Sequence, residues 1–385
     1  MDLIWTDEQQ MLRQAVRDVC EKHSTTDIVR ELEDDPVGFR REMWDELARM
    51  DLCGLLVPEE LGGIGGSMLD VALVYEEFGR ALASSPHWAS SVLCARVILL
   101  GGTDEQKQQW LPRIASGEVV LAPASFEPDQ PEGIEGITTR VEADRLTGTK
   151  MLVPFASSAA ALLVIARDTE GIGLWLVDSK ETSIEQTKTM ASDASYLVTL
   201  DGTPGERLGT ATGETWERAL IASLVPLAAY AVGGAQRAHE LAVDYAKERE
   251  QFGKPIGSFQ GVAHPLAEMA AEIEGARILV HEAAWAHDNN RDAAPLAAMA
   301  KLFCADVFRK TTKVGQQTFG GIGFTTEVDM QLFYRRAKQL ELLWGPAMLE
   351  ELIAAAELDA PDPYVTMEVG GRESNTRDHL SLVQT

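Results

Sequence analysis

Basic side chains are scarce in this chain of 385 residues. It has 34 Lys and Arg against 60 Asp and Glu, which gives a formal net charge of −26 and a sequence pI near 4.6. Such an acidic balance excludes nucleic acid and anionic membrane surfaces as partners. A phosphate-bearing ligand would therefore have to be held by local Arg, Lys and backbone N–H groups.

Cysteine pairs and long apolar runs are also absent. The four cysteines contain no C-x-x-C pair, so we expect small buried side chains in a reducing compartment at Cys20, Cys53, Cys94 and Cys304. The N-terminal segment does not combine basic residues with a following apolar run, as a signal peptide does. No uninterrupted apolar span reaches eighteen residues. We predict a cytoplasmic protein that does not bind a membrane, and no metal site.

The hydrophobic pattern of the sequence changes twice, which predicts three folded parts and a tail. Residues 1–117 have helical periodicity, and Thr6 and Thr103 each begin a capping box. Residues 118–212 alternate short apolar runs with turns, which predicts a β-domain. Residues 213–357 are helical again, and residues 358–385 form a polar tail that we expect to be exposed.

The stretch from Gln236 to Met269 predicts two long helices joined by a short turn. The first helix is expected to end at Phe252-Gly253, with Pro255 just beyond, and the second to begin near Phe259. An Arg at a helix end, a Gly that allows close approach of the backbone, and a Gln amide together suit a phosphate-bearing ligand. The spacing alone also fits a plain helical hairpin with a surface Arg.

This turn reads R-x-Q-F-G-x-P-I-x-x-F-Q and closely resembles a signature of the acyl-CoA dehydrogenase family. The resemblance implies a mostly α fold, with an N-terminal helical domain, a middle β-barrel and a C-terminal four-helix bundle. It also implies FAD shared across a subunit interface, with Arg249, Phe252 and Gln260 directed at a neighbour's cofactor. Further on, the family element Q-x-x-G-G-x-G adds Gln317, Gly320 and Gly321 to that set.

Two flavin-facing signatures of the family are degraded. A Thr-Glu-Pro-Gly-x-Gly-Ser-Asp loop is expected where this chain has residues 124–133, and only Glu127-Pro128 remains. A Trp-Ile-Thr strand is expected at residues 150–155, but Pro154 stands in place of the hydroxyl residue and removes a backbone donor. The groups that would cradle a flavin ring in this chain's own pocket are therefore expected to be missing.

The catalytic base of the family is also absent from its usual place. A run like Y-R-D-A-K ending in Glu-Gly normally supplies a carboxylate that removes the α-proton of a thioester. Here the run reads Tyr334-Arg-Arg-Ala-Lys, and Trp344 occupies the Glu position. Indole cannot accept a proton at neutral pH.

Some members of the family carry the catalytic Glu at a place equivalent to Ser223. Glu217 is six residues too early, and Glu341 is a weak substitute on a similar helix face.

Three hypotheses follow. The first is a non-catalytic subunit of a heteromeric α2β2 acyl-CoA dehydrogenase of the steroid side-chain type. Its paralogous partner would carry the Glu and the acyl-CoA, and an electron-transfer flavoprotein would accept the electrons. The second is a flavin-dependent monooxygenase or oxidase of the same fold. The third is a flavin-free scaffold subunit.

Overall fold

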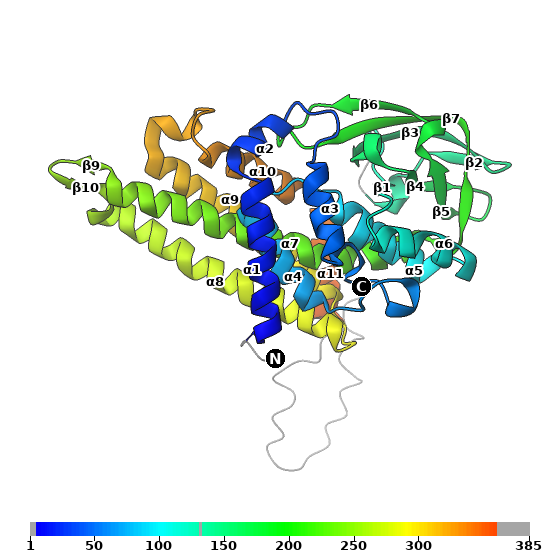
Figure 1. Cartoon of the computed structure of the whole chain (residues 1–385), viewed down its shortest axis with the longest axis horizontal. Coiled ribbons are helices and arrows are strands. Elements are labelled where there is room, and N and C mark those ends of the chain that lie inside the picture. The colour runs from blue at the N-terminus through cyan, green and yellow to red at the C-terminus, as the bar shows by residue number, and fades with distance from the viewer. Residues whose placement is uncertain (1–4, 131–132, 360–385) are drawn as a thin grey trace, which may run out of the picture.

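The computed structural model describes residues 5–130 and 133–359. Helices form the N-terminal part, a β-sheet forms the middle, and longer helices form the C-terminal part, which confirms the predicted fold class. Figure 1 shows the sheet at the upper right and the long helices running to the left.

The N-terminal helices begin where the sequence predicts. Thr6 and Thr103 both form complete capping boxes, at the first residues of α1 and α6. The helices of this part are α1 (Asp7–His23), α2 (Thr26–Leu32), α3 (Arg41–Arg49), α4 (Met68–Arg80), α5 (Ala95–Gly101) and α6 (Asp104–Ala115). A π-helical turn, Trp88–Cys94, leads directly into α5. All four cysteines are free and buried, as predicted.

The predicted barrel takes the form of one eight-stranded sheet. Its strands are β1 (Leu121–Ala124), β2 (Arg140–Glu142), β3 (Arg145–Pro154), β4 (Ala161–Arg167), β5 (Ile172–Asp178), β6 (Ser183–Thr187), β7 (Ser195–Pro204) and β8 (Glu206–Thr212). The order is β6-β7-β3-β2-β4-β5-β8, with β1 parallel to β4. Strand β4 is buried on both faces apart from its last residue, which explains its continuous apolar run.

The C-terminal part contains α7 (Gly213–Glu248), α8 (Gln260–Asp288), α9 (Ala294–Phe319), α10 (Met330–Leu342) and α11 (Pro346–Asp359). Helix α7 is long and apolar enough to span a membrane, but 78% of its apolar window is buried inside the protein. It is the central helix of the core. A Cβ at Gly233 would lie 1.8 Å from the Glu76 carbonyl, so α7 and α4 meet closely there.

The chain between α7 and α8 differs from the prediction. Helix α7 ends at Glu248, and a two-stranded hairpin follows, β9 (Glu250–Gln251) with β10 (Lys254–Pro255). Both turn residues have positive φ, 55° at Phe252 and 80° at Gly253, as in the tight turns that suit twisted hairpins. The predicted end of the helix was therefore four residues too late, because Phe252-Gly253 closes a hairpin instead.

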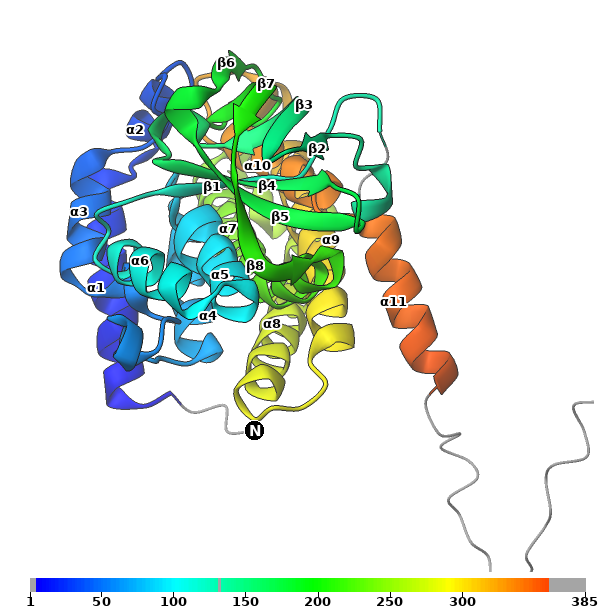
Figure 2. The ribbon, with the colours of Figure 1, turned by 90° about the vertical axis from the view of Figure 1, so that its right-hand side faces the viewer.

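Helix α11 leads away from the body of the protein at the lower right of Figure 2. It extends to Asp359, so it includes the first two residues of the predicted polar tail. The remainder of that tail, residues 360–385, lies outside the described residues.

Candidate functional site

The side chain of Trp344 is buried at the end of α10. Trp344 and Gly345 have positive φ angles of 70° and 66°, so the chain leaves the helical conformation directly after α10. The indole of Trp344 is 8% exposed, and its ring centroid lies 4.6 Å from that of Trp88 and 5.1 Å from that of Phe126. Aromatic side chains from the N-terminal helices and from the β-domain thus enclose it.

The two positions where the family resemblance allows a catalytic Glu converge on Trp88. Its ring packs against Trp344, and its Nε1 donates a 2.7 Å hydrogen bond to the carbonyl of Ser223. The hydroxyl of Ser223 donates to the Ala219 carbonyl at 2.7 Å and is completely buried. Neither position carries a carboxylate, so neither supplies a base.

Trp344 separates two cavities. The first, which we call the Glu217 cavity, has a volume of about 400 Å³, and the second, which we call the Arg336 cavity, has a volume of about 430 Å³. Phe126, Leu342 and Trp344 line both of them. These side chains form the wall where the two cavities would otherwise join.

The Glu217 cavity is unsuited to a dinucleotide. Among the described residues that line it there is no Lys, Arg or His, and Glu217 is the one carboxylate. Burial raises the pKa of Glu217, and the nearby carboxylates of Glu135 and Glu214 raise it further. A pyrophosphate would meet negative charge and no cation here. Sequence spacing had excluded Glu217 from the site, whereas the structure places it in the cavity wall opened by the first turns of α7.

Glu341, the weak substitute for the base, is held by cations. Its carboxylate lies 2.8 Å from Arg309 Nε and 2.5 Å from Lys338 Nζ. It does not line either cavity beside Trp344, within the described part of the chain. These contacts give Glu341 a role in joining α10 to α9.

The retained Glu127 of the degraded loop is a structural anchor. Its side chain accepts hydrogen bonds from the backbone and hydroxyl groups of Thr138 and Thr139, and from Lys150 Nζ at 2.6 Å. Burial opposes ionisation of Glu127, but Lys150 and the threonines hold its pKa at about 2. Lys150 is completely buried, and burial lowers its pKa to about 8. Both groups are therefore charged at neutral pH, and they join the loop to β3.

The strand that the family resemblance places against a flavin ring, residues 150–155, is irregular. Leu152 has a positive φ of 52°, and the pairing of β3 with β7 shifts register between Lys150 and Val153. Leu152 and Pro154 line the Arg336 cavity. Their side chains are apolar, and Pro154 has no N–H to donate. These two positions therefore supply no polar side chain to a flavin ring.

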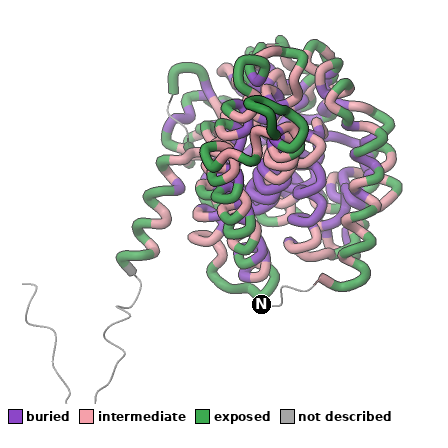
Figure 3. The backbone as a smooth tube through the Cα atoms, turned by 90° about the vertical axis from the view of Figure 1, so that its left-hand side faces the viewer, coloured by how far each residue is buried: buried purple, intermediate pink, exposed green. Residues whose placement is uncertain are grey.

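The second set of predicted site residues lies on the outside, at the hairpin end of the bundle. Arg249, Phe252 and Gln260 are all exposed, and Phe252 is 93% exposed. Arg249 has no carboxylate within ion-pair distance among the described residues, although the chain is strongly acidic. Figure 3, which looks onto this end, shows exposed residues there.

The segment after α9 reaches the same end. Tyr245, near the end of α7, stacks on Phe319, the last residue of α9, with ring centroids 4.4 Å apart. This contact brings the exposed Gln317, Gly320 and Gly321 to the hairpin end. No described atom lies within 4 Å of the place where a Cβ would stand at either glycine, so a ligand could approach the backbone there.

The outer set offers groups that suit a phosphate-bearing ligand. Arg249 supplies an unpaired cation, the two Gln residues supply amides, and the glycines supply accessible N–H groups. All these residues are exposed. The predicted residues thus fall into two places, an enclosed site that lacks the expected chemistry and an exposed half-site that retains it.

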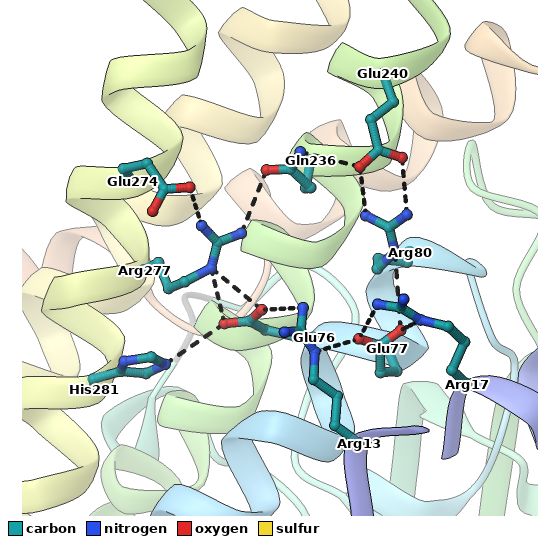
Figure 4. Close-up of polar contacts among 10 residues, drawn as sticks. All are labelled: Arg13, Arg17, Glu76, Glu77, Arg80, Gln236, Glu240, Glu274, Arg277 and His281. Carbon is teal, nitrogen blue, oxygen red and sulfur yellow. Dashed lines mark hydrogen bonds and ion pairs between the residues drawn. The ribbon is translucent and has the colours of Figure 1, made fainter. Parts of the chain in front are cut away.

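A third polar cluster connects side chains of α1, α4, α7 and α8 (Figure 4). Glu77 is 1% exposed and accepts from Arg13 at 2.7 Å and from Arg17 at 2.8 Å. Glu76 is equally buried and lies 3.3 Å from Arg277 Nε. These ion pairs tie α1 and α8 to α4, which is a structural role.

Two family models match the chain. The acyl-CoA dehydrogenase N-terminal domain matches residues 6–118, and the acyl-CoA dehydrogenase C-terminal domain matches residues 216–358. The probable acyl-CoA dehydrogenase YngJ of Bacillus subtilis (strain 168) is 31% identical over 400 residues, covering 93% of this chain and 100% of its own length.

Two solved structures are similar along nearly their whole length. The steroid ACAD Tcur3481–Tcur3483 has a TM-score of 0.82 at 31% identity, covering 91% of this chain and 98% of the matched one. The ChsE4–ChsE5 complex from Mycobacterium tuberculosis has a TM-score of 0.84 at 26% identity, covering 94% of this chain and 100% of the matched one.

Proposed function

The chain belongs to the acyl-CoA dehydrogenase family, and on that premise we propose that it is the non-catalytic subunit of a heteromeric acyl-CoA dehydrogenase. FAD is the cofactor of the assembled enzyme. A paralogous partner carries the catalytic Glu and binds the acyl-CoA. This chain completes the partner's FAD site, and an electron-transfer flavoprotein accepts the electrons.

The buried indole of Trp344 carries this proposal. The α-proton of a thioester is weakly acidic, so its removal needs a positioned base and a polarised carbonyl. Trp344 offers one N–H donor and no basic site, and it also fills the space between the two cavities. A chain built in this way leaves proton abstraction to another subunit.

The exposed half-site supports the second part of the proposal. Arg249, Gln260 and Gln317 would hold the dinucleotide of a neighbouring chain, with the backbone at Gly320 and Gly321 beside it. FAD, when bound, accepts the β-hydrogen of the substrate as hydride. The contribution of this chain is to bind and orient the cofactor, which needs surface groups and no base.

The comparisons support a paired assembly and a substrate class. One similar structure is a complex of two named chains, ChsE4 and ChsE5, and another carries the description steroid ACAD. We therefore propose an α2β2 assembly acting on a steroid-like or branched acyl thioester. The same-fold monooxygenase remains the alternative in which this chain holds its own flavin.

Flavin retention by the assembled enzyme tests the proposal. Arg249→Ala and Gln317→Ala should each weaken FAD binding, Arg249→Ala by about tenfold to a hundredfold because a charged hydrogen bond to phosphate is lost. Arg291→Ala removes the same charge beyond the opposite end of α8, where Arg291 lies over Trp285, and should leave retention unchanged. Equal retention in all three variants would favour a flavin-free scaffold.

A further inference from the structure

Arg336 differs from the other cations of its helix. Helix α10 carries three basic side chains, and Arg335 pairs with Glu33 while Lys338 pairs with Glu341. Arg336 has no carboxylate within 4.0 Å in the part of the chain that the structure describes. It lines the Arg336 cavity instead. A cation that lines a cavity and has no carboxylate within ion-pair distance is available to an external anion.

The hydrogen bonds of Arg336 leave donors available. Its Nη1 donates to the Tyr230 hydroxyl at 3.0 Å, and its Nε is buried without a partner. Burial raises the pKa of Tyr230, so that hydroxyl keeps its proton and can itself donate. A guanidinium offers five N–H donors in a planar fork that matches a carboxylate. Arg336 and Tyr230 can thus bind one carboxylate together.

The rest of the cavity suits an apolar body. Its wall includes Trp88, Phe155, Leu342 and Trp344, and its volume of about 430 Å³ is within the range of small-molecule sites. Arg336 and Leu342 are six residues apart on one helix, which separates them by about 9 Å along its axis. A ligand with its charged end on Arg336 would therefore extend an apolar chain or ring towards Trp344.

The other polar groups of the cavity do not compete for the anion. His87 Nε2 lies 2.9 Å from the Leu52 carbonyl and must donate to it, so Nδ1 accepts from the Tyr75 hydroxyl at 2.8 Å. Burial lowers the pKa of His87 to about 4, so it is neutral. Asp193 is the one carboxylate of the described lining, and it accepts from Gln339 Nε2 at 2.5 Å and from the Thr189 hydroxyl.

We propose that the Arg336 cavity binds an apolar monocarboxylate, an aliphatic or ring-bearing carboxylic acid, with its carboxylate on Arg336 and Tyr230 and its body against Trp88 and Trp344. Arg336 is partly buried, but its Nε is buried without a hydrogen-bond partner, and a carboxylate ligand would satisfy that donor through charge-assisted hydrogen bonds. The site belongs to this chain alone and does not depend on the proposed partner.

The test uses the isolated full-length chain and three probes of equal chain length: octanoate, octan-1-ol and octylamine. Using the chain alone avoids the substrate site of a partner subunit. Calorimetric titration should show octanoate binding most tightly, octan-1-ol more weakly and octylamine weakest. Arg336→Gln should weaken octanoate binding by about tenfold to a hundredfold and leave octan-1-ol unchanged, because only the charged hydrogen bonds are lost.

Three further variants separate binding from folding. Arg335→Gln removes a charge from the same helix outside the cavity and should bind octanoate like the wild type. Arg336→Lys keeps the cation and should keep the preference for octanoate over octan-1-ol. Asp193→Asn removes a repelling carboxylate and should tighten octanoate binding. Equal affinity for octanoate and octan-1-ol, an unchanged affinity in Arg336→Gln, or no binding of any probe would overturn the proposal.

Discussion

The ring of Trp344 packs against the ring of Trp88, with centroids 4.6 Å apart and planes inclined by 50°. Trp88 in turn donates to the backbone of Ser223 in α7. The pair therefore joins the end of α10 to α7, at the two positions where the family resemblance predicts a base. This aromatic contact holds three elements together.

Removing the Trp344 indole should destabilise the protein. Trp344→Ala should lower the free energy of unfolding by about 3 kcal/mol, near the lower end for buried aromatic side chains, since cavities already border the ring on two sides. Trp344→Phe should cost less, because a ring remains against Trp88. Urea denaturation monitored by circular dichroism measures both values, and an unchanged midpoint in Trp344→Ala would show that the aromatic contact does not support the fold.

The remaining carboxylates near the site should be dispensable for turnover. Glu341 is held by Arg309 and Lys338, and no cation is found among the described residues that line the cavity of Glu217. Glu341→Gln and Glu217→Gln should leave the turnover of the assembled enzyme within about twofold, since a catalytic base contributes about a hundredfold or more. A loss of that size in either variant would identify that residue as a base and place catalysis on this chain.

The Glu127–Lys150 pair should make the free energy of unfolding depend on pH in the acidic range. The pKa of Glu127 is about 2 in the folded chain against an ordinary value of 4.5, so the unfolded chain binds the extra proton between these values. Stability from this group is present above about pH 4.5 and is lost as pH falls towards 2. The slope of unfolding free energy against pH in this window should be smaller in Glu127→Gln than in the wild type. Parallel slopes would contradict the assignment.

The buried cluster of Figure 4 offers a matched pair of variants. Glu77→Gln leaves Arg13 and Arg17 without their shared carboxylate and should cost about 3–5 kcal/mol of stability. Glu274→Gln changes a 65% exposed partner of Arg277 and should cost less than about 1 kcal/mol. Chemical denaturation of both variants under one condition provides the comparison, and equal losses would show that burial does not set the contribution of these ion pairs.

The sequence predicted the helices and strands more successfully than it predicted which residues line the cavities. Local patterns depend only on residues that are close in the sequence, so they can be recognised without a structure. Examples are the capping boxes at Thr6 and Thr103 and the apolar run of β4. The end of α7 was misplaced because Phe252, a bulky side chain, adopts the positive φ of a hairpin turn. Propensity alone does not predict that conformation.

Which residues line the two cavities beside Trp344 depends on tertiary contacts, which the sequence alone does not give. The spacing that excluded Glu217 measures distance along one helix, whereas the cavity wall also draws on the loop before β2 and on α11. Arg336 did carry a signal, because the second Arg of Tyr334-Arg-Arg-Ala-Lys stands where the family run has Asp. Only the structure shows that this Arg lines a cavity and that no carboxylate among the described residues lies within ion-pair distance of it.

Native mass spectrometry tests the central claim most directly. The protein would be measured alone and then after co-expression with a paralogous acyl-CoA dehydrogenase that carries the catalytic Glu. Our account predicts a flavin-free chain alone and an α2β2 species with two FAD per four chains in the mixture. A homo-oligomer with one FAD per chain would contradict it, because the site beside Trp344 would then hold a flavin of its own.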